Sequence, residues 1–205
     1  MITITLANEN AIKYACLKYH YAKRTPLISV GFNVYEDDVW CGVILYGLGA
    51  NPQIASSYDK WSGQVVELVR VALNGKQKTT SECLAASLRE LKKIAPAVDL
   101  VISYADKDQG HNGIIYQATN WIYVGLMNEG SKSDFIINGK KMHQRTVRNR
   151  NWKQSLEWIR LYIDPEATQE TTKGKHKYLF PMNKKMRKTI KVLEREYPTK
   201  HAEIV

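Results

Sequence analysis

SYADKDQGHNGIIYQATNWIYVG, residues 103–125, is the stretch of the sequence that decides the fold. The apolar run Val98–Tyr104 leads into it with the length and β-branched content of a buried strand, and the run stops at Asp106. A polar loop with two glycines follows, and then come a helix-compatible segment, Ile114–Thr119, and another short strand, Trp121–Gly125. This order predicts an α/β protein.

Three side chains of this stretch lie where ligands usually bind: Asp106, His111 and Tyr116. In open α/β sheets, ligands collect where strands end and loops begin. We therefore treat the three as candidate catalytic residues. The alternative is structural, with Asp106 capping a turn and Tyr116 packing in the core, since Asp and Gly are ordinary loop residues.

The length and charge of the chain limit its class. Its 205 residues suffice for one domain, and we expect a single domain over 1–205, with a core over about 1–130 and a basic C-terminal extension over about 131–205. Lys and Arg number 30 against 20 Asp and Glu, which gives a net charge of +10. That balance favours a polyanionic partner, nucleic acid before an anionic membrane; the alternative is a generally basic protein.

The cysteines and the N-terminus point to the cytoplasm. Cys16, Cys41 and Cys83 are too few and too scattered for a disulfide framework or a zinc site. The N-terminus has no signal-peptide pattern, and no stretch approaches the roughly 20 apolar residues that span a bilayer. We expect reduced thiols, no membrane and a cytosolic protein.

The first 73 residues predict a strand, a helix and three further strands. Strand Val65–Leu73 contains charged residues among apolar ones, and alternation puts Glu67 and Val69 on one face and Arg70 and Ala72 on the other. The other expected elements are a strand over Ile2–Leu6, a helix over Asn8–Lys18 and a β-hairpin of Leu27–Tyr35 with Val39–Tyr46.

A glycine-and-lysine loop joins this strand to a marked helix start. Thr79 with Glu82 three residues on is a capping box, and the helix is expected to run to about Ile94. Unpaired first-turn N–H groups and the helix dipole favour an anion such as a coenzyme pyrophosphate. The alternative is a plain strand–helix connection. The candidate cofactor-binding residues are Gly75, Lys76, Gln77, Lys78, Thr79 and Thr80.

Two later segments, Ser131–Arg160 and Lys173–Lys191, mix basic and aromatic residues. Such a mixture suits a surface that neutralises phosphates and stacks on an extruded base, and the alternative is a solvated basic face. Between the two, Asp164–Gly174 is expected to be a mobile loop, and residues 199–205 are expected to be disordered.

The order of elements resembles the GNAT acyltransferase fold, a mixed central sheet flanked by helices with acyl-coenzyme A on the loop equivalent to Gly75–Ser81. This loop departs from the usual pattern, because it reads NGKQKTTS where alternating glycines are expected. Over roughly residues 10–190 the sequence also resembles the Mom family of phage DNA-modification proteins. The strings that carry this resemblance are ELVR at 67–70, SYAD at 103–106, GHNG at 110–113, IYQA at 115–118 and NW at 120–121.

The resemblance implies an enzyme that converts adenine in double-stranded DNA to N6-(carbamoylmethyl)adenine. Such a modification protects phage DNA from restriction enzymes in the cytoplasm of the infected host. It also implies that Asp106, Tyr116, Arg70 and Ser81 are needed for activity, and that the pair His20-Tyr21 holds an iron ion. The alternative for that pair is an aromatic helix end packed on the sheet.

The residue types fit the implied chemistry. Adenine N6 is a poor nucleophile, so we expect Asp106 to accept its proton as a general base. Tyr116 would protonate the leaving group or orient the base, with His111 as the alternative acid. A stacked adenine must also be flipped out of the duplex, and Trp61 and Tyr46 are candidates to hold the extruded ring.

The product constrains the acyl donor. Direct transfer from acetyl-CoA would leave an N6-acetyl amide, whereas a carbamoylmethyl group has a methylene on the nitrogen and a terminal amide. This argument favours an activated glycyl carrier such as glycyl-tRNA, which adds tRNA to the expected partners. Acetyl-CoA is the alternative donor. Two other functions compete: an acyl-CoA-dependent N-acyltransferase acting on a protein or small amine, and a non-enzymatic DNA-binding protein.

Overall fold

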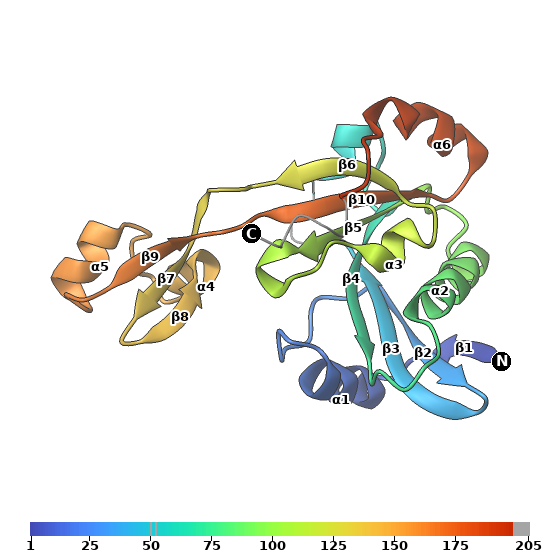
Figure 1. The fold of residues 1–205 in the computed structure, drawn as a ribbon, viewed down its shortest axis with the longest axis horizontal. Helices are drawn as coiled ribbons and strands as arrows, with labels where there is room; N and C mark the ends of the chain where they lie inside the picture. The colour runs from blue at the N-terminus through green and yellow to red at the C-terminus, as the bar shows by residue number, and fades with distance from the viewer. Residues whose placement is uncertain (50, 52, 199–205) are drawn as a thin grey trace. The chain divides into compact units, whose positions relative to one another are not determined.

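The computed structural model describes residues 1–49, 51 and 53–198, and the chain forms two compact units (Figure 1). Unit 1 comprises residues 1–104, 113–125 and those from 177 on, and unit 2 comprises 105–112 and 126–176. The segment expected as a basic C-terminal extension therefore contributes to both units. Residues 199–205, expected to be disordered, lie outside the described part of the chain.

Within the described residues, seven strands form one sheet. They are β1 (Ile2–Leu6), β2 (Val30–Glu36), β3 (Val39–Gly47), β4 (Val65–Leu73), β5 (Leu100–Asp106), β6 (Ile122–Met127) and β10 (Lys175–Pro181). The order across the sheet is β1-β2-β3-β4-β5-β10-β6, antiparallel from β1 to β4 and parallel between β4 and β5. The expected mixed α/β sheet is confirmed, and β4 has the bounds that the sequence predicted.

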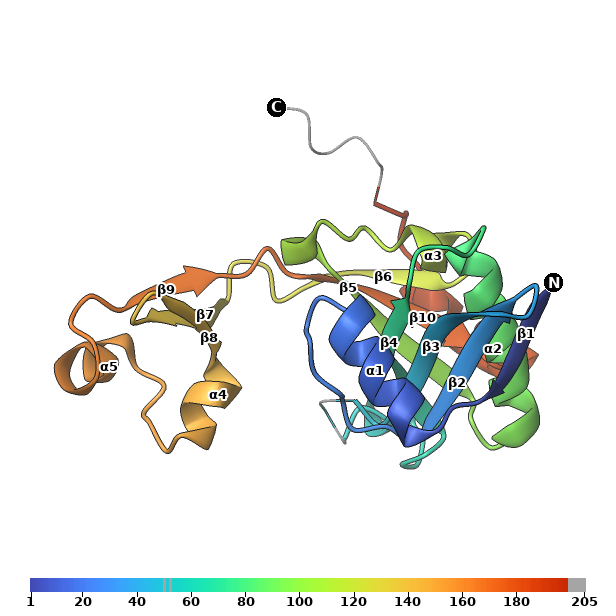
Figure 2. The same cartoon turned by 90° about the horizontal axis from the view of Figure 1, so that it is seen from below.

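Two long helices cover opposite faces of strands β1 to β4 (Figure 2). Helix α1 (Glu9–Tyr19) is capped by Asn8, and Ile12, Ala15 and Cys16 bury one face of it against β3 and β4. Helix α2 (Thr80–Ile94) begins at the expected capping residue, because the Thr79 side chain accepts a hydrogen bond from the Glu82 amide.

The smaller elements of unit 1 complete its second core. Met186 and Ile190 of α6 (Lys184–Ile190) pack with buried residues of β4, β5, β6 and β10. The other short elements are η1 (Ser56–Tyr58), α3 (Ile114–Gln117) and η3 (Lys191–Leu193). Helix α6 therefore helps to bury the sheet in addition to carrying charge.

Strand β4 contains a β-bulge that changes which side chains share a face. In the pairing with β3, Val69 is the extra residue between the paired Leu68 and Arg70. Val69 and Ala72 both pack in the cluster beneath α1. The strict alternation expected from the sequence, which put these two on opposite faces, is therefore wrong, because one extra residue shifts the phase of the side chains.

Unit 2 contains a small antiparallel sheet of its own, in the order β8-β7-β9. Phe135, Val147 and Ile159 are buried in its core. The segment 164–174 was expected to be a loop, but it includes strand β9, which pairs with β7. The elements are η2 (Lys107–Gln109), β7 (Lys132–Ile137), β8 (Lys140–His143), α4 (Gln144–Asn149), α5 (Leu156–Tyr162) and β9 (Thr168–Thr171).

Among the described residues, none of the helices has the length and apolar character needed to cross a membrane.

Candidate active site

A glycine places Tyr116 in the interior of unit 1. Helix α3 starts after Gly113, which has φ of +75°, and a Cβ there would lie 2.3 Å from the Tyr178 ring. Residues other than glycine are strained at this φ, and the Tyr178 ring already fills the space that a side chain would need. The ring of Tyr116 consequently packs between Tyr178 and Trp121, with centroids 5.0 Å away in both cases, and is only 7% exposed.

The Tyr116 hydroxyl belongs to a buried series of hydrogen bonds. It lies 2.9 Å from the hydroxyl oxygen of Ser103, which is 3.1 Å from the Leu68 carbonyl oxygen. Because a carbonyl can only accept, the single Ser103 proton serves either the carbonyl or the tyrosine. The tyrosine hydroxyl can therefore accept a hydrogen bond from Ser103 or donate one to it.

The environment keeps Tyr116 in its neutral form. Burial raises the pKa of Tyr116 to about 12, against a smaller lowering by the Ser103 hydrogen bond, and the charges of Tyr21 and Glu67 raise it further. Desolvation always disfavours the charged form of a group. At neutral pH this phenol can donate a proton or a hydrogen bond, and it cannot serve as a general base.

Glu67 is an acidic residue close to this site, and no separate role was predicted for it from the sequence. A Cβ at Gly49, which has φ of +72°, would lie 2.0 Å from the Glu67 carboxylate oxygen, so this carboxylate lies directly against the glycine backbone. The pKa of Tyr104 is raised to about 12 by burial, with the Glu67 charge as the next cause. Glu67 thus acts electrostatically on one buried tyrosine, Tyr116, and one partly buried tyrosine, Tyr104. A carboxylate within an apolar strand was the sequence signal for it.

Arg70 offers an unused hydrogen-bond donor. One terminal nitrogen donates to the Val69 carbonyl at 2.6 Å, while Nε is buried and has no hydrogen-bond partner among the described residues. Burial lowers the pKa of Arg70, the Arg24 charge lowers it too, and Tyr21 and Glu67 oppose this. A buried unsatisfied N–H is costly and suits an oxygen that a bound substrate would supply.

The loop of the candidate cofactor residues is held by its own side chains. The Lys78 amide donates to the Glu36 carboxylate at 2.7 Å, and the Lys78 ammonium lies 3.9 Å from Asp37. The Lys76 amide donates to the Asn74 side chain at 2.9 Å. An anion binding to the Lys78 amide would therefore have to displace a carboxylate.

The remaining residues at the start of α2 fix the helix end. The Gln77 side chain donates to the Thr80 hydroxyl at 2.9 Å, and Thr79 serves as the N-cap. Gly75 has φ of +79°, and a Cβ at this position would have no atom within 4 Å. Ser81 lies half-buried in the first helical turn. This is the helix N-terminus that the sequence predicted, and its role in binding a cofactor stays a prediction.

Asp106 and His111 belong to unit 2. Asp106 ends β5 as expected, and its carboxylate lies 3.1 Å from the Lys175 ammonium and accepts the Asp108 amide at 3.1 Å. The side chain caps η2, as the structural alternative expected, and the catalytic role of Asp106 stays a prediction. The side chain remains 14% exposed. His111 is exposed, and its amide donates to the Asp106 carbonyl at 3.1 Å.

The iron site expected at His20 and Tyr21 is not supported by the structure. The rings of His20 and Tyr21 lie against each other with centroids 4.3 Å apart, and His20 Nδ1 accepts the Ala22 amide at 3.1 Å. Throughout the described part of the chain, no group of three or more His, Cys, Asp or Glu side chains could hold a metal ion. The two rings pack on each other, but Tyr21 is 48% exposed, so packing of this pair on the sheet, the expected alternative, is not shown either.

The two residues expected to hold a flipped base differ in exposure. Trp61 is 82% exposed, so its ring is accessible. Tyr46 is fully buried, and its hydroxyl lies 2.7 Å from that of Ser87. The expectation that Tyr46 contacts an extruded base is wrong in this structure, because its strand lies in the centre of the sheet, where α1 and α2 cover both faces.

The fold is similar to that of solved acetyltransferases. It is similar to that of the spermidine/spermine N-acetyltransferase SpeG from Vibrio cholerae, with a TM-score of 0.52 and 8% identity over 92% of this chain and 99% of that one. A Bacillus subtilis acetyltransferase solved with CoA gives a TM-score of 0.48 and 10% identity over 88% of this chain and 99% of that one. The SpeG similarity shows that the fold is that of the GNAT acyltransferases.

The sequence then gives the family. Residues 1–199 match the Mom protein family, and the chain belongs to that family. It is 24% identical to the methylcarbamoylase mom of Escherichia phage Mu over 176 aligned residues. This alignment covers 83% of this chain and 71% of that protein. The family resemblance drawn from the strings around Arg70, Asp106 and Tyr116 is confirmed.

Proposed function

We propose that the protein is a phage DNA-modification transferase that converts adenine in double-stranded DNA to N6-(carbamoylmethyl)adenine. The observation that supports this most is the match of residues 1–199 to the Mom family, together with the name of the phage Mu relative. A net charge of +10 suits a DNA substrate. The modified bases would protect the DNA from restriction enzymes in an infected bacterium.

Tyr116 and Arg70 supply the acid and the electrophilic assistance in this proposal. The neutral phenol of Tyr116 donates a proton to the leaving group and regains one from solvent once the product leaves, while the hydrogen bond with Ser103 holds the hydroxyl in place. The unpartnered Nε of Arg70 donates to the acyl oxygen, on which negative charge develops as adenine attacks. Burial is the main cause of the raised pKa of Tyr116, and the Glu67 charge is a smaller cause that raises the pKa of both Tyr116 and Arg70.

Asp106 remains our candidate for the base that takes the proton from adenine N6. Its carboxylate is fixed by Lys175 and by the turn cap, and it keeps an exposed edge. His111, exposed on the same loop, is the alternative acid. A duplex adenine must leave the base stack before it can react, and the accessible ring of Trp61 is our candidate to hold it.

The donor that balances the product is an activated glycyl group, such as that of glycyl-tRNA. N6 attacks the glycyl carbonyl carbon, the ester oxygen leaves with a proton, and N6 loses one to the base. The glycyl amine then attacks C6 through a five-membered ring. The bond between C6 and the former N6 breaks, that nitrogen gains the proton that the amine loses, and it becomes the terminal amide.

Labelled glycine tests this proposal. Cells that express the chain are grown with ¹⁵N-glycine, and their DNA is digested and analysed by fragmenting mass spectrometry. We expect a deoxyadenosine that is heavier by one carbamoylmethyl group, with ¹⁵N on the nitrogen bound to C6. A modified base with no label, or with the label in the terminal amide, would refute the glycyl route.

An acyl-CoA-dependent N-acyltransferase of a protein or small amine is the alternative function. It requires coenzyme A on the loop Gly75–Ser81, where the Lys78 amide is already bonded to Glu36. This bond disfavours an additional anion at that amide. Coenzyme A binding together with unmodified adenine in DNA would favour the alternative.

A further inference from the structure

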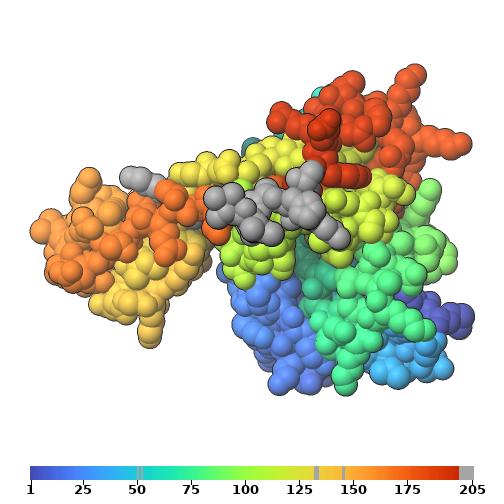
Figure 3. Space-filling view, in the orientation of Figure 1, coloured from blue at the N-terminus to red at the C-terminus, as the bar shows by residue number. Residues whose placement is uncertain are grey.

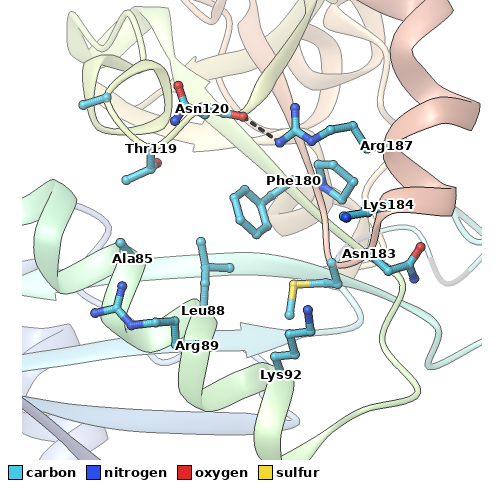
Figure 4. Close-up of a pocket in the computed structure, with 13 residues that line it drawn as sticks. Ala85, Leu88, Arg89, Lys92, Thr119, Asn120, Phe180, Asn183, Lys184 and Arg187 are labelled. Carbon is cyan, nitrogen blue, oxygen red and sulfur yellow. Dashed lines mark hydrogen bonds between the residues drawn. The ribbon is translucent and has the colours of Figure 1, made fainter.

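Unit 1 contains a cavity of about 540 Å³ that involves none of the candidate catalytic residues. Helix α2, residues 118–120 after α3, and the segment from β10 into α6 form its walls (Figure 4). Figure 3 shows the same segments next to one another on the surface, coloured green, yellow-green and red. The floor is apolar, with Leu88, Met182 and the partly exposed Phe180.

The rim of the cavity is strongly basic. Arg89 and Lys92 project from α2, and Lys184 and Arg187 project from α6 on the other side (Figure 4). None of the described lining residues is acidic, and within the described ranges none of the four cations forms an ion pair. The four charges are therefore available to an anionic ligand.

Two hydrogen bonds order the rim. The Arg187 guanidinium donates to the Asn120 carbonyl at 3.3 Å. Asn183 donates to Asp99 at 2.6 Å, and Asp99 is also ion-paired with Lys60 at 2.5 Å. The carboxylate next to the cavity is thus already neutralised by a lysine that lies outside it.

A phosphate joined to a flat apolar ring matches this combination. Arginines and lysines on two sides can neutralise phosphate oxygens, and an aromatic side chain in the floor can stack on a base. The volume lies within the range of small-ligand sites. A base in this floor must be unpaired, because a paired base has both faces stacked in a duplex.

We propose that this cavity binds one unpaired nucleotide of a DNA strand, with its phosphates on Arg89, Lys92, Lys184 and Arg187 and its base on Phe180. This rests on the proposed DNA substrate and adds to it a strand contact separate from the reacting adenine. Flipping one base leaves its former partner unpaired in the opposite strand, and this site would hold that nucleotide.

The test measures binding of a fluorescein-labelled single-stranded DNA by fluorescence anisotropy across a salt series. The double variant Arg89→Ala/Lys184→Ala removes one cation from each side, and Lys13→Ala/Lys188→Ala removes two exposed lysines that do not line the cavity. We expect the first variant to bind about tenfold more weakly or worse, with a salt slope smaller by about 1.4. The control should bind like the wild type.

A second variant tests the base contact. Phe180→Leu keeps an apolar floor and removes the ring, and we expect a loss of about 5- to 150-fold with an unchanged salt slope. Thermal unfolding of each variant confirms that the protein is folded. Equal losses in the cavity and control variants, or no loss in either, would overturn the proposal, as would tighter binding to single-stranded RNA of the same sequence.

Failure of this site and failure of the proposed function give different results. If the cavity is wrong, the wild type still produces modified adenine and the cavity variants bind DNA normally. If the function is wrong, DNA contains no modified adenine although the cavity variants still bind it more weakly than the control.

Discussion

Replacing Tyr116 with Phe removes one hydroxyl and keeps the ring between Tyr178 and Trp121. Ser103 retains the Leu68 carbonyl as an acceptor, so we expect a loss of only about 0.5–1.5 kcal/mol in the free energy of unfolding at neutral pH. If the phenol is the proton donor, modified adenine should fall by about 10²- to 10⁴-fold. Stability and activity should therefore respond very differently to this change.

Tyr46→Phe is the matched control. Tyr46 is also buried, its hydroxyl lies 2.7 Å from Ser87, and Ser87 keeps the Leu84 carbonyl at 2.8 Å. The expected loss of stability is similar, and activity should stay near that of the wild type. Urea unfolding followed by nucleoside mass spectrometry measures both quantities. A Tyr116→Phe variant that is as active as Tyr46→Phe would refute the role of the phenol.

The same substitution predicts a change in alkaline stability. The pKa of Tyr116 is raised from 10.0 to about 12, so the folded state disfavours its ionised form. This contribution is fully present below pH 10 and is lost as pH rises through 12, about 3 kcal/mol in total. Between pH 10 and 12 the free energy of unfolding should fall less steeply with pH in Tyr116→Phe than in the wild type, by the amount that corresponds to about one fewer proton released on unfolding. An unchanged slope would show that the residue is not neutral and buried in solution.

Three further substitutions test the glycine, the arginine and the loop. Gly113→Ala should lower the free energy of unfolding by about 1–3 kcal/mol more than Gly75→Ala does, because both glycines have positive φ but only Gly113 also faces a ring. Thermal unfolding measures the difference, and equal shifts in melting temperature would contradict it. Arg70→Lys keeps the charge but removes Nε, and modified adenine should fall about 10²-fold, whereas full activity would exclude that donor. Glu36→Ala frees the Lys78 amide and should tighten pyrophosphate binding about tenfold by calorimetry, and unchanged binding would show that Glu36 does not compete.

Local patterns predicted most of the elements. Strand Val65–Leu73, the cap at Thr79 and the strand that ends at Asp106 all follow from apolar periodicity and capping, which depend on neighbouring residues. The bulge at Val69 did not follow, because it depends on the register with β3. Which strand pairs with which is decided by contacts far apart in sequence.

The C-terminal part of the chain shows the same limit. Lysines dominate residues 173–191, so the sequence suggested a charged surface there. Yet Tyr178 and Leu179 are fully buried in β10, which lies between β5 and β6 in the sheet. The short apolar core of KHKYLFP was the available signal, and the flanking charges obscured it.

The candidate site was predicted in part for similar reasons. Tyr116 and Arg70 stood out by residue type and by family strings, but the contact of Ser103 with Tyr116 and Leu68 requires β4 and β5 to be in register. Likewise, the cavity around Phe180 joins three segments that are distant in sequence. Composition could indicate a basic surface but could not locate it.

Nucleoside mass spectrometry of DNA from cells expressing the wild type, Tyr116→Phe or Tyr46→Phe tests the central claim most directly. We predict a deoxyadenosine heavier by one carbamoylmethyl group in the wild type and in Tyr46→Phe, and its near absence in Tyr116→Phe. Unmodified adenine in DNA from cells that contain well-folded wild-type protein would contradict the claim.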